Sequence, residues 1–320
     1  MSDVDLSIVI PVYNNASTLD ELLDRLVAVL EPLQISFELI LVDDGSRDES
    51  FDVLQRRAAA DPRIRPFALA RNFGSQGAIC AGFDRVRGRW GICMDADLDN
   101  CPEDVPRLLE PLTRGYDLVC GYRENRHAPW LTRRLPSKLM NAYARRQTGV
   151  AVRDVGCGMR AFEARIVRDL AAEGEARRLL TPVFLRRARR VTEVALSDGA
   201  ARSSGGHSFL SLLGIAADYY MLTARRPFLV FGLASLALTG VGVAMALGGA
   251  RTSALVVFAT GLLATLASLV GEYCQRLYHL NQGTPFYALR MLDRDEPVAA
   301  LRRGSRARNE ACEPRSATPS

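Results

Sequence analysis

The chain has 320 residues and a formal net charge of +5 at pH 7, and 24% of its residues are charged. That length holds one domain of about 200 residues and a further segment. Seven scattered cysteines show no metal-ligand spacing, which argues against a disulfide framework and fits a reducing compartment. No nucleic-acid partner is expected.

Short apolar runs alternate with amphipathic stretches in the first part of the chain. We expect strands at 6–10, 37–42, 64–70 and 90–94, and helices at about 18–30, 46–60 and 75–86. Thr18 with Glu21, and Ser46 with Glu49, have the spacing of a capping box, which marks the starts of the first two helices. The alternation predicts an α/β fold with a mostly parallel sheet and helices on both faces.

Polar residues follow each expected strand. They are Pro11-Val12-Tyr13, Asp43-Asp44, Arg71-Asn72 and Asp95-Ala96-Asp97. Parallel α/β sheets bind ligands at the carboxyl ends of their strands, so these segments should converge on one crevice. For Asp43 and Asp44 a second interpretation stays open, in which they form a turn before the following helix.

The apolar run that ends at Met94 leads into carboxylates at alternate positions, Asp95, Asp97 and Asp99. If the strand stays extended through them, all three project to one side. Oxygen ligands of this kind suit Mg2+ or Mn2+, which would carry a diphosphate. The alternative is a solvated acidic loop after a buried strand.

Several motifs together resemble a known family. They are Val9-Ile10-Pro11-Val12-Tyr13-Asn14, Val42-Asp43-Asp44-Gly45-Ser46, Arg71-Asn72-Phe73-Gly74, Met94-Asp95-Ala96-Asp97-Leu98, Gly121-Tyr122-Arg123-Glu124-Asn125-Arg126, Asp154-Val155-Gly156-Cys157-Gly158-Met159-Arg160 and Gly271-Glu272-Tyr273-Cys274-Gln275-Arg276-Leu277-Tyr278. The first four resemble the GT-A fold of glycosyltransferase family 2. The last three narrow the resemblance to the branch that glycosylates polyprenyl phosphates. It covers roughly residues 5 to 290.

The resemblance implies a site for a nucleotide-sugar donor. Its donor-binding residues would be Pro11, Tyr13, Asp43, Asp44, Arg71 and Asp95. Asp95, Asp97 and Asp99 would hold the cation, with Asp97 counted among the catalytic residues. Relatives usually have glutamine where this chain has Asp99, so a third anionic ligand and an acid on a loop both stay open for that position.

The resemblance also implies an acceptor site for a lipid phosphate. Its residues would be Arg123, Arg126, Ser137 and Arg160, because guanidinium groups suit phosphate oxygens. Asp154 would orient the acceptor or take a residual proton. One displacement without a covalent intermediate would invert the anomeric centre. Relatives carry a lysine in a later segment that is missing at 202–209, where Arg202 and His207 are the candidates to replace it.

Two uncharged stretches indicate a membrane-spanning hairpin. Residues 227–249 and 253–272 are each long enough to cross a bilayer. The arginines on both flanks outnumber Arg251 in the turn, which places the flanks in the cytoplasm. The expected organisation is a cytoplasmic catalytic domain at 1–206, an interfacial amphipathic helix at 207–226, the hairpin at 227–272, and a cytoplasmic tail at 273–320, largely disordered after about 293.

Together with the two uncharged stretches, the resemblance implies a multi-pass enzyme of the bacterial inner membrane. It would move a sugar to undecaprenyl phosphate on the cytoplasmic leaflet, and similar bacterial enzymes favour UDP as the carrier of that sugar. Its partners would be the donor, the polyprenyl phosphate and the bilayer. A transferase for another lipid acceptor and a non-catalytic membrane scaffold are the alternatives. Which sugar is transferred, and whether the chain forms a homo-oligomer, stay open.

Overall fold

The computed structural model describes residues 4–123 and 287–291 and, between them, a discontinuous set: 141, 145–146, 150, 152–154, 156–168, 170, 180–197, 259, 263, 266–267, 270–271, 273–274 and 277. The predicted interfacial helix at 207–226 and the first predicted span at 227–249 lie outside these residues, as does most of the second span. Within the described part of the chain, no helix combines the length and apolar character that crossing a bilayer requires.

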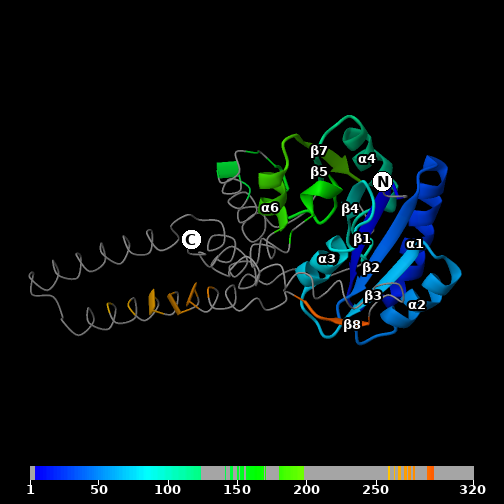
Figure 1. Ribbon diagram of the computed structural model, residues 1–320, viewed down its shortest axis with the longest axis horizontal. Coiled ribbons are helices and arrows are strands. Elements are labelled where there is room, and N and C mark those ends of the chain that lie inside the picture. The colour runs from blue at the N-terminus through cyan, green and yellow to red at the C-terminus, as the bar shows by residue number, and fades with distance from the viewer. Residues whose placement is uncertain are drawn as a thin grey trace, which may run out of the picture.

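Strands and helices alternate along the chain, as the apolar pattern predicts (Figure 1). The strands are β1 (Leu6–Val12), β2 (Phe37–Asp43), β3 (Ile64–Leu69), β4 (Trp90–Cys93), β5 (Leu118–Arg123), β6 (Arg160–Glu163), β7 (Val191–Leu196) and β8 (Leu289–Met291). The α-helices are α1 (Ala16–Leu30), α2 (Ser50–Ala60), α3 (Ser75–Phe83), α4 (Val105–Thr113) and α6 (Leu180–Arg187), and short 3-10 turns cover Glu31–Leu33, Pro102–Asp104 and Ala164–Ile166.

The described strands form one sheet in the order β7-β5-β6-β4-β1-β2-β3-β8. The pairs β1–β2, β1–β4, β2–β3 and β5–β7 are parallel, which confirms the predicted mostly parallel sheet. Two strands run against the others: β6 is antiparallel to β4 and β5, and β8 is antiparallel to β3. The segment 273–320 was predicted as a tail without a strand, and β8 at Leu289–Met291 was therefore not predicted.

Both faces of the sheet are covered by helices, which confirms that prediction. Apolar side chains of α1, α2 and α4 pack in one core cluster, and those of α3 and α6 pack in a second. β1 and β2 are buried along their whole length, so their side chains serve both clusters. The central strands are therefore rigidly held, and their carboxyl ends form a fixed platform for the polar loops that follow.

Both predicted capping boxes are wrong. Helix α1 begins at Ala16, so Thr18 lies inside it, where its hydroxyl donates to the Ala96 carbonyl (2.8 Å). Helix α2 begins at Ser50 rather than after Ser46. The Ser46 hydroxyl instead accepts a hydrogen bond from the Asn14 backbone N–H (3.0 Å). The Thr18 hydroxyl links α1 to the loop after β4, and the Ser46 hydroxyl links the loop after β2 to the loop after β1. Local sequence spacing does not reveal these contacts between distant residues.

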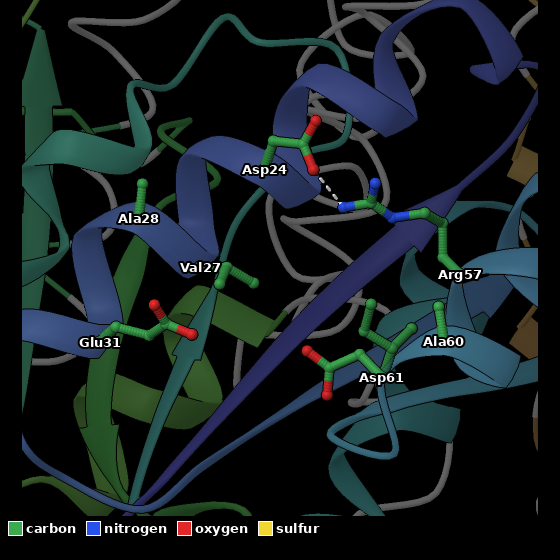
Figure 2. A pocket seen from close by; sticks show the side chains of 8 residues that line it. Asp24, Val27, Ala28, Glu31, Arg57, Ala60 and Asp61 are labelled. Atoms are coloured by element: carbon green, nitrogen blue, oxygen red, sulfur yellow. Dashed lines mark hydrogen bonds and ion pairs between the residues drawn. The ribbon is translucent and has the colours of Figure 1, made fainter.

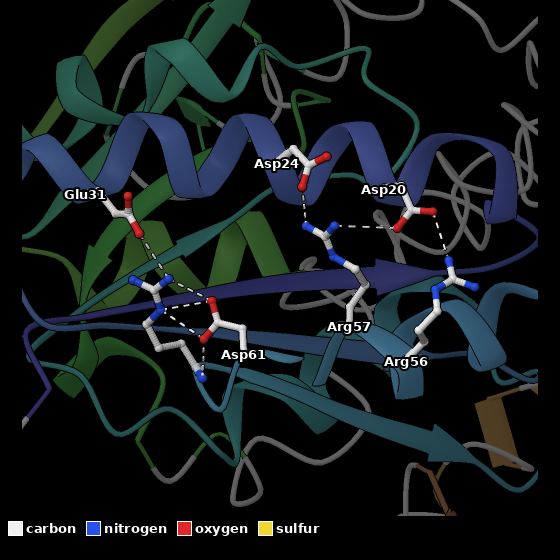
Figure 3. A network of polar contacts seen from close by, with 7 residues as sticks. Asp20, Asp24, Glu31, Arg56, Arg57 and Asp61 are labelled. Carbon is white, nitrogen blue, oxygen red and sulfur yellow. Dashed lines mark hydrogen bonds and ion pairs between the residues drawn. The ribbon is translucent and has the colours of Figure 1, made fainter. Parts of the chain in front are cut away.

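Exposed ion pairs connect α1 with α2 and the turn after it. Figure 3 shows Arg56 and Arg57 of α2 reaching Asp20 and Asp24 of α1. A pocket of about 410 Å³ lies beside this network, lined by Asp24, Val27, Ala28, Glu31, Arg57, Ala60, Asp61 and Ile64 (Figure 2). Ile64 begins β3, so the pocket lies toward the amino ends of the strands. It is therefore separate from the loops that carry the predicted site.

Candidate active site

The acidic segment after β4 forms a tight turn. The strand ends at Cys93, Leu98 adopts a left-handed backbone (φ 63°), and the Asp99 backbone N–H donates to Asp97 Oδ1 (3.0 Å). The extended backbone that would project all three carboxylates to one side therefore ends before Asp95. Among the described residues, no group of three His, Cys, Asp or Glu side chains is arranged to hold a metal ion. The three aspartates share one turn, and their role as cation ligands stays a prediction.

The Asp95 carboxylate is contacted both by its own turn and by the segment before β6. The buried Asn100 side chain donates to Asp95 Oδ2 (3.3 Å). Removal from water raises the pKa of Asp95, and the nearby Asp97 charge raises it further, while Arg160 and Arg123 act in the opposite direction. A divalent cation would add positive charge beside Asp95 and Asp97, and carboxylate oxygens are ligands that suit a hard cation.

Gly158 lies directly against this carboxylate. A Cβ atom added to Gly158 would overlap Asp95 Oδ2 and crowd the rest of the carboxylate. The segment before β6 can approach the acidic turn this closely only because residue 158 has no side chain. Gly158 belongs to the predicted Asp154–Arg160 motif, but its contact with Asp95 could not be read from the sequence.

Replacing Gly158 with alanine should push the Asp95 carboxylate away from its present position. We expect kcat to fall about a hundredfold, because small misplacements of reacting groups cost that much. Gly156→Ala is the matched control, since its Cβ would meet Asp154 Oδ1 at an ordinary 3.5 Å. Steady-state rates and thermal melts of the two variants make the comparison, and equal activity in both would remove Gly158 from the site.

Arg123 and Asp154 form an ion pair next to the acidic turn. The Arg123 Nε donates to Asp154 Oδ2 at 3.2 Å, and both side chains are mostly shielded from solvent. Burial acts to lower the pKa of Arg123, but the charges of Asp154 and Asp99 outweigh it and raise that pKa. The structure therefore brings together the predicted acceptor arginine and the predicted catalytic aspartate from segments 31 residues apart.

Arg160 occupies a deeper position than the acceptor role suggests. It begins β6, where it lies opposite Cys93 of β4 and Cys120 of β5, and only 8% of it is exposed. Its charge lowers the pKa of Asp95. Arg160 thus contributes positive charge beneath the acidic turn.

The predicted donor residues at the carboxyl ends of β1 and β2 lie side by side. Pro11 pairs with Val42 in the sheet register, and Val12 pairs with Asp43. Tyr13 is 41% exposed. Asp43 is buried, and its carboxylate accepts a hydrogen bond from the Ser46 N–H. This bond is the turn-forming role considered for Asp43.

Asp44 links the loop after β2 to the loop after β3. Its carboxylate accepts a hydrogen bond from the Phe73 backbone N–H (2.6 Å), and burial raises its pKa. Gly45, with φ 70°, packs so closely on Arg71 and Asn72 that a Cβ would lie 2.9 Å from their backbone atoms. The Arg71 guanidinium lies 4.3 Å from the centre of the Phe73 ring. Asp44 and Gly45 therefore hold in place the loop that contains Arg71.

Two predicted acceptor residues, Arg126 and Ser137, lie outside the described residues, as do the candidates at 202–207. Sequence reasoning missed Asn100, Gly158 and Thr18. Asn100 directly follows the acidic triplet and Gly158 lies in the Asp154–Arg160 motif, so both positions carried a signal in the sequence. The Thr18 contact joins residues 78 apart in the chain and has no sequence signature.

The fold is shared by sugar-transferring enzymes. Mannosyl-3-phosphoglycerate synthase from Rubrobacter xylanophilus superposes with a TM-score of 0.53 at 18% identity, over 70% of this chain and 74% of that one. Glucosyl-3-phosphoglycerate synthase from Mycobacterium tuberculosis, solved with Mn2+, uridine diphosphate and phosphoglyceric acid, superposes with a TM-score of 0.50 at 20% identity, over 69% and 79%. At these identities the likeness defines the fold, which is the GT-A fold of glycosyltransferases.

Residues 7–171 match glycosyl transferase family 2, and the chain belongs to that family. A relative from Pseudomonas syringae is 38% identical over 92% of this chain and 93% of its own length, and is named undecaprenyl-phosphate 4-deoxy-4-formamido-L-arabinose transferase. A relative of the same name from Pseudomonas fluorescens SBW25 is 36% identical over 92% and 91%. The predicted family resemblance and the α/β part of the predicted fold are confirmed.

Proposed function

We propose that the protein is a glycosyltransferase that moves a sugar from a nucleotide-sugar donor to undecaprenyl phosphate. The observation that carries this proposal is the similarity, over nearly the whole chain, to transferases named for that acceptor. The Arg123–Asp154 pair supports it, because the Arg123 guanidinium, a group that suits phosphate oxygens, interacts with the carboxylates of the acidic turn. The sugar that these relatives name, 4-deoxy-4-formamido-L-arabinose, is the first candidate, and UDP is the first candidate for its carrier.

A divalent cation, Mg2+ or Mn2+, would be held by Asp95 and Asp97. The fit rests on oxygen ligands and on the desolvated, negatively charged surroundings of Asp95. When bound, such a cation neutralises the negative charge that grows on the nucleoside diphosphate as the sugar leaves. Asn100 and Gly158 would hold Asp95 in place for this task.

The acceptor phosphate would replace Asp154 as the partner of Arg123. A phosphate monoester has a second pKa of about 6, so it is largely ionised at neutral pH and needs no strong base. One of its oxygens forms a bond to the anomeric carbon while the bond from that carbon to the nucleoside diphosphate breaks. Asp154, released from Arg123, would orient the acceptor or take a residual proton. This single displacement inverts the anomeric centre.

A polyprenyl acceptor requires that the catalytic domain work at a membrane surface. The uncharged stretches at 227–249 and 253–272 and the arginines that flank them support an inner-membrane hairpin with the catalytic domain in the cytoplasm. The stretch at 207–226 would lie along the interface and lead into the first span.

Release of nucleoside diphosphate from a panel of UDP- and GDP-sugars tests the function. The purified full-length protein is incubated with each donor, with and without undecaprenyl phosphate and Mn2+. Release that requires both would establish the transferase and name the donor. Release that occurs only with another lipid, such as diacylglycerol, would reassign the acceptor, and no release from folded protein would favour a scaffold.

A further inference from the structure

The short strand β8 joins the catalytic sheet next to the loop after β3. It pairs antiparallel with β3, with Ala68 opposite Met291 and Leu69 opposite Leu289. The Ala70 N–H donates to the Ala288 carbonyl (2.8 Å). Because β8 is antiparallel, the chain enters the sheet at the carboxyl end of β3, which is the edge that carries the site. Figure 1 shows β8 at the outer edge of the sheet beside β3.

Tyr287 anchors this entry point to the residues that follow α3. Its hydroxyl donates to Asp84 Oδ2 (2.6 Å) and accepts from Arg85 Nη1 (3.2 Å). Burial and the Asp84 charge raise the pKa of Tyr287, so its hydroxyl keeps the proton that it donates. Arg85 is buried, and its guanidinium lies 4.8 Å from the centre of the Phe67 ring on β3.

The loop after β3, residues 70–74, is held from two neighbouring strands. On the β2 side, Asp44 accepts from the Phe73 N–H and Gly45 packs on the Arg71 backbone. On the β8 side, Ala288 accepts from the Ala70 N–H. β3 lies between β2 and β8 in the sheet. We call residues 70–74 the donor loop, because Arg71 is the donor-binding residue that it presents.

We infer that Tyr287 is a positioning residue for donor binding: its contact with Asp84 holds the entry to β8 and, through Ala288, the start of the donor loop. This inference rests on the proposed function, because it takes the donor loop to be part of the binding site for the nucleotide-sugar. Tyr287 lies C-terminal to the predicted membrane hairpin. A segment that follows the hairpin in the chain would therefore return to the catalytic domain and complete the donor side of the site. The hydroxyl acts through the loop and does not touch the donor.

The test compares Tyr287→Phe with Tyr116→Phe in the full-length protein. Phenylalanine keeps the ring against Arg85 and removes only the hydroxyl. Tyr116 is a matched control, because its ring contacts Arg190 near the start of β5, at a distance in the sheet from β3. Amide exchange at residues 70–74, the Kd of UDP, and KM and kcat for the nucleotide-sugar are measured for each.

For Tyr287→Phe we expect exchange at Ala70 and Phe73 to accelerate about tenfold, which corresponds to the loss of one hydrogen bond to a charged group. KM for the donor and the Kd of UDP should rise about fivefold, with kcat within about twofold of the wild type. Asp84→Ala should reproduce these changes, and combining the two substitutions should add little, because both remove the same contact. Tyr116→Phe should match the wild type.

Unchanged exchange and UDP affinity in Tyr287→Phe would overturn the inference, as would an equal effect of Tyr116→Phe. A fall in kcat alone would also contradict it, because a donor-positioning role acts on KM. The exchange measurement needs no turnover. If the wild type binds neither UDP nor GDP and transfers no sugar from any donor, the proposed function fails. The effect of Tyr287 on the loop is then still decided by amide exchange.

Discussion

Asp97→Asn is expected to lower kcat a hundred- to a thousandfold, which is about what the loss of one charge-stabilising group costs an enzyme. Asparagine is close to aspartate in shape, and its side-chain oxygen can still accept the bond from the Asp99 N–H that shapes the turn. The substitution therefore removes one negative charge from the proposed cation site and leaves the local backbone in place. Rates at increasing Mn2+ should show a higher half-saturating concentration as well as a lower plateau.

Asp99→Asn is the matched comparison. Asp99 contributes its backbone N–H to the turn, and that group survives the substitution. A loss of less than about tenfold would agree with a cation held by Asp95 and Asp97 alone. A loss equal to that of Asp97→Asn would support Asp99 as a third ligand. Full activity of Asp97→Asn would exclude the proposed cation site.

Arg123→Gln is the second substitution with a large expected effect. It removes the charge proposed to bind the acceptor phosphate and leaves Asp154, which is only 16% exposed, without its ion-pair partner. Truncating one member of a shielded charge pair costs about 2–5 kcal/mol, so kcat/KM for undecaprenyl phosphate should fall at least about thirtyfold. Arg123→Lys should retain only part of the wild-type kcat/KM, because an ammonium group cannot donate two parallel hydrogen bonds to a phosphate as a guanidinium can.

Arg153→Gln controls for a general loss of positive charge near the site. Arg153 pairs with Glu193 and lies over the Tyr122 ring, and its side chain is 68% exposed. Its loss should change kcat/KM by less than about threefold. Initial rates at varied undecaprenyl phosphate and saturating donor make the comparison. If Arg123→Gln raises KM for the donor and leaves KM for the lipid unchanged, then Arg123 belongs to the donor site.

Apolar patterning predicted the first four strands to within two residues at either end, because buried parallel strands are nearly continuous apolar runs. The start of α3 at Ser75 matched the prediction, whereas the starts of α1 and α2 lie two and four residues from the predicted ones. The hydroxyls of Thr18 and Ser46 bond to Ala96 and Asn14 instead of capping helices. A distant carbonyl or N–H competes for a hydroxyl as effectively as the local helix end does, and only the folded chain reveals which partner wins.

By itself, the sequence determined the family, the alternating α/β architecture and the placement of aspartates and arginines after successive strands, because these follow from composition and short-range order. Only the tertiary structure decided that the acidic triplet bends at Leu98 and that Arg123 pairs with Asp154. The structure also decided that the Asp95 carboxylate occupies the space where a side chain at position 158 would lie. It also decided that β6 and β8 run antiparallel to their neighbours. Each of these depends on contacts between residues far apart in the chain, or on backbone angles that neighbouring loops impose, and no local pattern encodes them.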